Sequence, residues 1–274
     1  MERFSVSMCV YGGDNPQWFT SAVESILHQT VPPSEVVLVV DGPVPEELDI
    51  VIRKYEENQL FHVIRLPENQ GHGNARRTGL AACRHPMVAI MDADDISVPQ
   101  RFEKQLSAFA ANPRLDIVGG NIAEFVGTPE NVVGKRIVPE TDSAIKQYMK
   151  TRCPMNLVTV MFRKTSVEQV GGFIDWYCEE DYYLWLRMAQ AGMRFANVPD
   201  ILVQVRVGED MYRRRGGWKY FRSEARLQKY MLENKIIGLP TYGVNLAKRL
   251  VVQVLLPNRI RGWVFQTFAR SRQT

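Results

Sequence analysis

Short apolar runs alternate with stretches of helical periodicity along the first half of this 274-residue chain. The apolar run at 4–12 is followed by apolar residues at helical spacing from Phe19 to Leu27. Asn15 is a good helix cap and Pro16 suits the first helical position, so a helix begins there. Further strands are predicted in the run that ends at Asp41 and at 60–66, 87–91, 114–125 and 157–162, with helices at 45–57, after the glycine-rich loop NQGHGNARR and at 99–111.

The second half is less regular. Pro129, Gly134 and Pro139 predict a loop over 127–141, and a helix opens with the acids of 179–181. Beyond residue 211 the pattern becomes helical and basic, with helices predicted at 217–235, 242–256 and 258–270. We therefore expect one domain over residues 1–210 and a basic amphipathic helical extension over 211–274.

Strands that alternate with helices are typical of an α/β protein with a mostly parallel sheet. Ligands of such sheets bind beyond the carboxyl ends of the strands. Tyr11, Asp41 and Asp92 each fall at the end of a predicted strand. The sequence therefore predicts a ligand site that these residues share.

Three carboxylates follow the buried strand at 87–91, in the stretch VAIMDADDI. Clustered acids repel one another and cost free energy to desolvate unless a cation or hydrogen-bond donors compensate them. A D-x-D at a strand end suits magnesium, manganese or calcium, and magnesium is usually shared with substrate phosphates. The acids thus indicate a cation site.

Acids in this pattern also occur in sites of other kinds. An EF-hand is excluded because Ile96 falls where its third ligand should lie. An aspartyl-nucleophile phosphatase usually carries the motif on its first strand, whereas here it follows the fourth. A metal-dependent nucleic-acid enzyme would need a partner acid on an earlier strand, which Asp41 could supply. The last alternative is a turn in which Asp92 caps the helix at 98–111.

Charge is unevenly spread. Residues 211–274 carry 14 Lys and Arg against 2 Asp and Glu, a net charge of +12, whereas residues 1–210 carry 20 against 28, a net charge of −8. A basic tail of this kind suits an anionic surface, or it docks onto the acidic part of the same chain. Hydrophobic residues make up 45% of the sequence, which indicates a folded protein rather than a disordered one.

The cysteines, the histidines and the apolar runs restrict further what kind of protein this is and where it works. The four cysteines form no CxxC pair and indicate reduced thiols. No histidine follows His85, which argues against a histidine base in the second half. No apolar run approaches the roughly 20 residues that span a bilayer, and no signal-peptide pattern opens the chain. We expect a protein of the cytoplasmic side.

The order of the motifs resembles the family 2 glycosyltransferases of GT-A fold over residues 4–206. The resemblance rests on the strand ending at Tyr11 and on SILHQTVPPSEVVLVVDG, ENQGHGNARRTGL, VAIMDADD and GGFIDWYCEEDYYLWLRMAQAG. The later ILVQVRVGEDMYRRRGGWKYFRSE is similar to bacterial enzymes that build capsular polysaccharide, exopolysaccharide or lipopolysaccharide. The resemblance implies a Rossmann-like, mixed, mostly parallel sheet flanked by helices, with a C-terminal helical extension.

The resemblance also implies an activity and its residues. It implies inverting transfer of a sugar from a nucleotide-sugar, a UDP-sugar above others, to a saccharide or lipid-linked saccharide, with a divalent metal (Mn²⁺ or Mg²⁺). The implied donor contacts are Tyr11, Asp41, Arg76 and Asp92, with Asp94 as the direct metal ligand and Asp95 as an orienting neighbour. The alternative for Arg76 is a solvated surface arginine.

A Glu-Asp pair at a helix start is where this family keeps its catalytic base. The pair matches Glu180 and Asp181, with Asp181 as base and Glu180 as acceptor contact. Glu179 is a rival, because three acids in a row leave the register open. Trp185 is expected in the core rather than under the site.

The sequence departs from the family pattern at the metal site. Many members carry a histidine after the last strand of the catalytic domain, but VQVRVGEDMY has none. Glu209, Asp210 or water would replace it.

The tail predicts where the enzyme works. Basic amphipathic helices with an aromatic residue indicate an anionic membrane surface, which a lipid-linked acceptor at the inner face of the cytoplasmic membrane would require. The alternatives are packing on the domain itself and a homodimer contact. Nucleic-acid binding is not expected, because no aromatic-basic binding motif is present. The apolar and basic positions are Val244, Leu250, Val251, Val254 and Leu255 around Lys248 and Arg249, then Ile260, Trp263, Val264 and Phe268 with Arg259, Arg261, Arg270 and Arg272.

Two other functions remain open. A metal-dependent nucleotidyl- or phosphotransferase would usually show basic residues in a glycine-rich loop after strand one, where this chain has YGGDNP. The second alternative function is that of a catalytically silent protein that binds a nucleotide-sugar or a saccharide. The intact DADD and EED motifs argue against this alternative.

Overall fold

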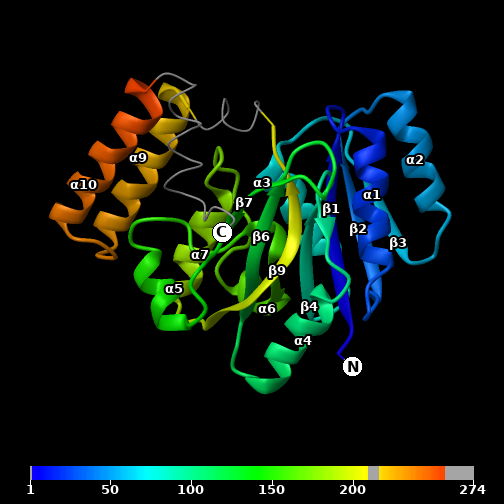
Figure 1. The fold of residues 1–274 in the computed structure, drawn as a ribbon, viewed down its shortest axis with the longest axis horizontal. Coiled ribbons are helices and arrows are strands. Elements are labelled where there is room, and N and C mark those ends of the chain that lie inside the picture. The colour runs from blue at the N-terminus through cyan, green and yellow to red at the C-terminus, as the bar shows by residue number, and fades with distance from the viewer. Residues whose placement is uncertain (1, 209–215, 257–274) are drawn as a thin grey trace.

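A nine-stranded mixed sheet forms the centre of the protein in this computed structural model, which describes residues 2–208 and 216–256 (Figure 1). The strand order is β3-β2-β1-β4-β8-β6-β9-β5, and β7 pairs with β6. The strands are β1 (Phe4–Tyr11), β2 (Glu35–Asp41), β3 (Phe61–Arg65), β4 (Met87–Asp92), β5 (Ile96–Ser97), β6 (Ile117–Phe125), β7 (Val132–Arg136), β8 (Met161–Arg163) and β9 (Phe195–Arg206).

The first four long strands are parallel, as the alternation of strands and helices predicts. β1 lies between β2 and β4, and the register pairs Tyr11 with Asp41 and Cys9 with Asp92. The second half adds antiparallel pairs between β4 and β8, β6 and β8, β6 and β7, and β5 and β9, while β6 and β9 are parallel. Every residue of β2 is buried, because helices cover both faces of the sheet.

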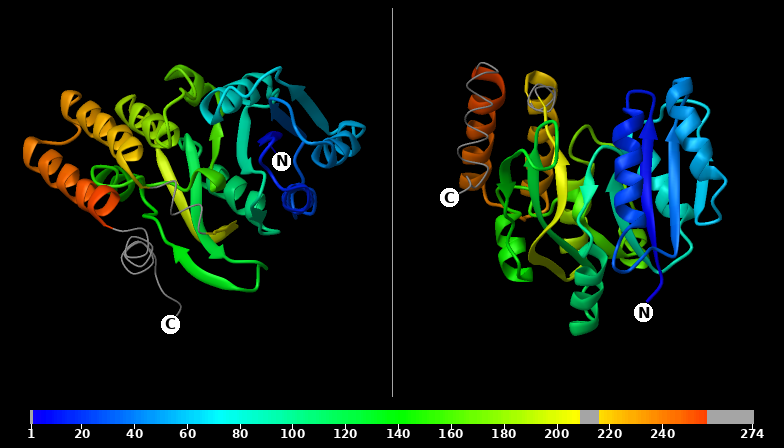
Figure 2. Two further views of the ribbon diagram at one scale, coloured as in Figure 1. Left: turned by 90° about the horizontal axis from the view of Figure 1, so that it is seen from above. Right: turned by 45° about the vertical axis from the view of Figure 1, so that its right-hand side comes forward.

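Helices lie on both faces of the sheet (Figure 2), and side chains between helices and sheet form two apolar cores. α1, α2 and α4 pack on one face through side chains such as Phe19, Leu48 and Phe102. α3, α7 and α9 contribute Leu80, Trp185 and other side chains to the second core. The helices are α1 (Pro16–Leu27), α2 (Glu46–Glu56), α3 (His72–Ala82), α4 (Arg101–Ala111), α5 (Asp142–Tyr148), α6 (Lys164–Gln169), α7 (Glu180–Gln190), α9 (Trp218–Glu233) and α10 (Leu239–Leu250), with short turns η1 (Leu157–Thr159) and η2 (Val251–Leu255).

The predicted cap of the first helix is confirmed. Asn15 accepts hydrogen bonds from the backbone N–H groups of Gln17 (2.9 Å) and Trp18 (3.1 Å), and Pro16 occupies the first helical position. The cap fixes where the chain turns from β1 into α1, directly beside the carboxyl end of β1.

Several predicted boundaries are wrong. The predicted loop over 127–141 contains β7, whose residues Val132 and Val133 suit an edge strand beside β6. The predicted strand over 157–162 is a 3₁₀ turn followed by the short strand β8. α4 begins at Arg101 with Gln100 at its N-cap and no side-chain cap, so Asp92 does not cap that helix.

The described part of the C-terminal extension packs on the domain. α9 buries Leu227 and Met231 in the second core, and α10 lies beside α9 (Figure 1). No helix in residues 2–208 and 216–256 is long and apolar enough to cross a membrane. The helix predicted at 258–270 lies outside the described residues.

Candidate active site

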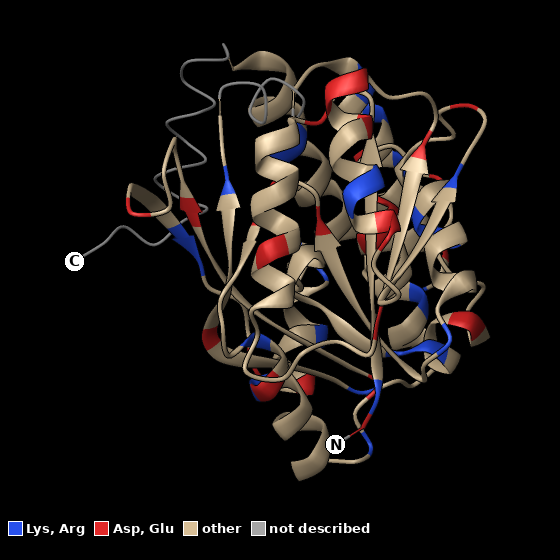
Figure 3. Ribbon diagram, turned by 90° about the vertical axis from the view of Figure 1, so that its right-hand side faces the viewer, with Lys and Arg blue, Asp and Glu red and all other residues tan. Residues whose placement is uncertain are grey.

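Charged residues lie at the carboxyl ends of parallel strands (Figure 3). Tyr11, Asp41 and Asp92 are the last residues of β1, β2 and β4, and β1 lies between the other two strands. The Tyr11 side chain is 41% exposed, so its ring is accessible at this edge. The structure thus brings together the three strand-end residues that the sequence predicts.

Asp41 is joined to the glycine-rich loop. Its two carboxylate oxygens accept hydrogen bonds from the backbone N–H groups of Gln70 (2.7 Å) and Gly71 (3.1 Å), and its backbone carbonyl accepts one from Asn69 (3.2 Å). The carboxylate therefore positions the loop that leads into α3.

Arg76 of α3 is directed to the acid cluster. Its guanidinium donates to Asp92 at 2.9 Å although the side chain is only 4% exposed, so the alternative of a solvated surface arginine is wrong. Burial would raise the pKa of Asp92, but the charge and hydrogen bond of Arg76 lower it below its usual value. The Nε atom of Arg76 is buried without a hydrogen-bond partner among the described residues.

Asp95 and Asp94 differ in their surroundings. Asp95 is 3% exposed and accepts a hydrogen bond from the backbone N–H of Arg206 at 2.8 Å. Burial and the neighbouring charges of Asp94 and Asp92 raise the pKa of Asp95 well above its usual range. Asp94 follows the carboxyl end of β4 and is partly exposed. Its carboxylate is the accessible one of the two.

The sequence analysis missed Arg206, at the end of β9. Its Nε donates to the backbone carbonyl of Asp94 (3.2 Å), and its guanidinium lies over the rings of Trp18 (4.5 Å) and Phe125 (4.6 Å). It supplies positive charge to the acids from the segment VQVRVG, where the family pattern places a histidine nearby. Glu209 and Asp210, the predicted substitutes for that histidine, lie outside the described residues.

A close backbone approach joins the glycine-rich loop to the segment before α7. A Cβ at Gly73 would lie 2.6 Å from the Cα of Asp175, so only glycine fits there without displacement. The charges of Arg76 and Asp92 also act on Glu180, which belongs to α7. Arg76 of α3, Asp92 of β4 and Glu180 of α7 are therefore close enough for their charges to interact.

The three acids at the start of α7 have different environments. Glu179 is 3% exposed and directed to α9, away from solvent. Asp181 is partly exposed, and its carboxylate accepts from the backbone N–H of Tyr182 (2.6 Å) and from the thiol of Cys153 (3.8 Å). Burial and the Asp181 charge raise the pKa of Glu180 to about 7. Glu180 and Asp181 are therefore the accessible pair.

Trp185 lies one turn further along α7. It is fully buried in the second core, which confirms its predicted place there. It gives α7 a rigid support behind the acids.

The acids fit a cation that shares its coordination with phosphate. No group of three or more His, Cys, Asp or Glu side chains in the part of the chain that the structure describes is arranged to hold a metal ion. Carboxylate oxygens are available from Asp94 and Asp92, and these are ligands that hard divalent cations prefer. Such a cation would need further oxygen ligands from a substrate diphosphate or from water.

A polar site at the carboxyl ends of a Rossmann-like sheet, with an inward-facing arginine and accessible acids, is typical of α/β enzymes that bind nucleotides. Residues 5–171 match the family described as glycosyl transferase family 2. The chain belongs to glycosyltransferase family 2, and the predicted family is confirmed.

Relatives and solved structures agree with this assignment. The amylovoran biosynthesis glycosyltransferase AmsE of Erwinia amylovora is 37% identical over 86% of this chain and 88% of that protein. The UDP-Gal:alpha-D-GlcNAc-diphosphoundecaprenol beta-1,3-galactosyltransferase of Escherichia coli is 34% identical over 98% of this chain and 97% of that protein. The solved mannosyltransferase PcManGT from Pyrobaculum calidifontis, in complex with GDP-Man and Mn²⁺, matches with a TM-score of 0.62 and 19% identity over 94% of this chain and 71% of that one. The predicted fold class is therefore confirmed.

Proposed function

We propose that this glycosyltransferase transfers a sugar, with inversion, from a UDP-sugar to a lipid-linked saccharide, and that it requires Mn²⁺ or Mg²⁺. The observation that carries the proposal is the meeting of Arg76, the DADD acids and the Glu180–Asp181 pair at one edge of the sheet. The names of the Escherichia coli and Pyrobaculum calidifontis proteins support a nucleotide-sugar donor, and the latter supports a divalent metal.

The donor would lie over the ends of β1, β2 and β4. Tyr11 offers an exposed ring to the base, and Asp41, at the end of the neighbouring strand β2, would contact the base or ribose. Arg76, which is paired with Asp92, would contact the diphosphate, and Asp92 would contact the ribose. A cation held by Asp94 and the diphosphate oxygens would neutralise the charge that develops on the leaving group.

Asp181 acts as the base in this proposal. Its carboxylate takes the proton of the acceptor hydroxyl while that oxygen forms a bond to the anomeric carbon from the side opposite the diphosphate. The bond from the anomeric carbon to the diphosphate oxygen breaks, and the nucleoside diphosphate leaves with the electron pair. Glu180 accepts a hydrogen bond from the acceptor and orients it.

An apolar helix face supports a membrane location for this reaction. α10 and η2 bury the polar side chains of Asn245 and Gln253 against the domain, whereas Val244, Val251 and Leu255 are 46–65% exposed. A helix that turns its apolar side to solvent suits the boundary between lipid headgroups and acyl chains. The basic tail would add attraction to anionic lipids. We assign the enzyme to the inner face of the cytoplasmic membrane, with residues 1–210 as catalytic domain and 211–274 as attachment.

Two experiments test the proposal. Calorimetric titration with UDP, GDP, CDP and ADP, with and without Mn²⁺, is expected to give metal-dependent binding of UDP. Asp181→Asn is expected to abolish transfer from the matching nucleotide-sugar and to keep UDP binding. Normal turnover of that variant would overturn the base assignment, and absence of binding to every nucleotide would overturn the donor assignment.

Membrane attachment needs its own measurement. In a flotation assay with vesicles of phosphatidylglycerol and phosphatidylethanolamine, the wild-type protein is expected to float with the vesicles. The double variant Val251→Glu and Leu255→Glu is expected to stay in the unbound fraction. Sedimentation without lipid gives the oligomeric state. A dimer that these substitutions dissociate would identify the face as a homodimer contact instead.

A further inference from the structure

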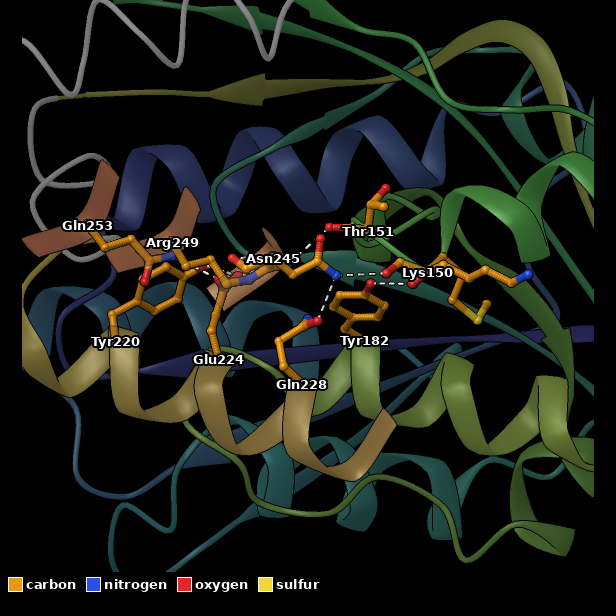
Figure 4. A network of polar contacts seen from close by, with 10 residues as sticks. Lys150, Thr151, Tyr182, Tyr220, Glu224, Gln228, Asn245, Arg249 and Gln253 are labelled. Carbon is orange, nitrogen blue, oxygen red and sulfur yellow. Dashed lines mark hydrogen bonds and ion pairs between the residues drawn. The ribbon is translucent and has the colours of Figure 1, made fainter. Parts of the chain in front are cut away.

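The α9–α10 hairpin holds two backbone segments that flank Asp181, and Figure 4 shows its contacts with the first of them, at Lys150 and Thr151. Asn245 of α10 donates to the carbonyl of Lys150 (2.9 Å), and Arg249 donates to that of Thr151 (3.1 Å). Ser223 of α9 donates to the carbonyl of Tyr177 (2.6 Å). One segment thus ends close to Cys153 and the other leads directly into α7.

Asp181 lies where these two segments meet. Its carboxylate contacts the thiol of Cys153, and the next residue, Tyr182, donates its hydroxyl to the carbonyl of Met149 at 2.5 Å. A shift of either segment would therefore move the carboxylate that faces the acceptor.

A buried ionic group connects the hairpin to the residue before the acids. Arg249 forms an ion pair with Glu224, and their side chains are only 13% and 12% exposed. Gln253 donates to the same carboxylate at 2.8 Å. Glu179 is buried next to Glu224, and burial, then the Glu224 charge, raise the pKa of Glu179 well above its usual range.

The turn that carries Glu179 is strained. Cys178 has φ of +58°, a left-handed conformation that a non-glycine residue rarely adopts. A contact from outside the turn is needed to keep such a conformation. The hydrogen bond from Ser223 to Tyr177 and the burial of Glu179 next to Glu224 lie on either side of Cys178 and provide it.

We infer that Glu179, Glu224 and Arg249, here called the clamp, are positioning residues that fix Asp181 for proton transfer. The inference rests on the proposed function, since it takes Asp181 as the base. Leu227 and Met231 already dock α9 through apolar contacts, and a buried ion pair costs desolvation free energy that apolar side chains would avoid. The ion pair lies next to Glu179, the residue directly before Glu180 and Asp181. A role in holding these acids explains why the ion pair is present, because catalysis is sensitive to displacements of about 1 Å.

Substitutions of the clamp test this role by steady-state kinetics. Transfer is measured with the nucleotide-sugar that turns over in the wild type, together with UDP binding by calorimetry. Glu179→Gln keeps the size of the side chain and its capacity to hydrogen-bond next to Glu224, and is expected to stay within twofold of wild-type kcat. Glu179→Ala and Arg249→Met are expected to lower kcat at least tenfold with donor KM and UDP affinity unchanged.

Lys248→Met is the matched control, because it removes an exposed positive charge from the neighbouring position of α10. It is expected to leave kcat unchanged with a water-soluble acceptor. If the two damaging variants fail to fold, Ser223→Ala decides, with an expected threefold loss of kcat.

Three results would overturn the inference. Wild-type kcat in Glu179→Ala and Arg249→Met would remove the positioning role. Equal losses in Glu179→Gln and Glu179→Ala would also remove it, because a side chain of the same size and hydrogen-bonding capacity would then not hold the turn. A fall in UDP affinity equal to the fall in kcat would indicate a general structural role. A wild-type enzyme that is inactive with every nucleotide-sugar would count against the proposed function itself.

Discussion

Replacing Glu180 by glutamine should raise the free energy of unfolding at alkaline pH, although it alters the proposed acceptor contact. In the unfolded chain this carboxyl releases its proton near its ordinary pKa of 4.5, whereas burial and the Asp181 charge hold the native pKa at about 7. The native state therefore binds the proton more tightly. The stability that this group contributes is fully present below pH 4.5 and is lost as the pH rises to about 7.

The size of the effect follows from the two pKa values. One pKa unit corresponds to about 1.4 kcal/mol, so the gap between 4.5 and about 7 amounts to roughly 3 kcal/mol once both states are ionised. Glutamine carries no charge at any pH and avoids this cost. Glu180→Gln should therefore unfold with a free energy up to about 3 kcal/mol higher than the wild type at pH 8, and with little difference at pH 4.5.

Urea denaturation of both proteins at pH 4.5, 6 and 8 measures the difference. Glu47→Gln is the matched control, since Glu47 is an exposed acid in the first turn of α2, as Glu180 is in the first turn of α7. The control should show no gain between pH 4.5 and 8. If the difference in the free energy of unfolding between Glu180→Gln and the wild type does not grow with pH, the reasoning is refuted. The charged form of Glu180 would then be as stable in the native state as in the solvated, unfolded chain.

Three further substitutions test other parts of the site. Arg76→Met should weaken UDP binding at least tenfold, because it removes the buried guanidinium; calorimetry with UDP and Mn²⁺ measures this, and unchanged affinity would exclude a diphosphate contact. Asp94→Asn should abolish the difference in UDP affinity with and without Mn²⁺, and a retained difference would place the metal on other ligands. Arg206→Leu removes two hydrogen bonds, to the carbonyls of Asp94 and Gly127, and should lower the free energy of unfolding by about 1–3 kcal/mol; a neutral outcome in urea denaturation would mean that solvent satisfies both.

The sequence located the strand-end residues because their placement follows from local pattern alone. An apolar run ends where a buried strand ends, and parallel strands end at one edge of the sheet. Tyr11, Asp41 and Asp92 could therefore be assigned to one site from the sequence. The same reasoning failed over 127–141, because β7 forms by pairing with β6 and not by a strong pattern of its own.

The sequence by itself thus determined the α/β class, the first helix and its cap, and the acids that face the ligand edge, since each depends on neighbours within a few residues. Only the tertiary structure decided which acid of 179–181 is buried, because that depends on Glu224 and Arg249, 45 and 70 residues away along the chain. It likewise decided that Arg206 compensates the acid cluster and that α10 turns its polar side chains inward. Such choices arise from contacts between distant segments, and no local pattern of apolar and polar positions encodes them.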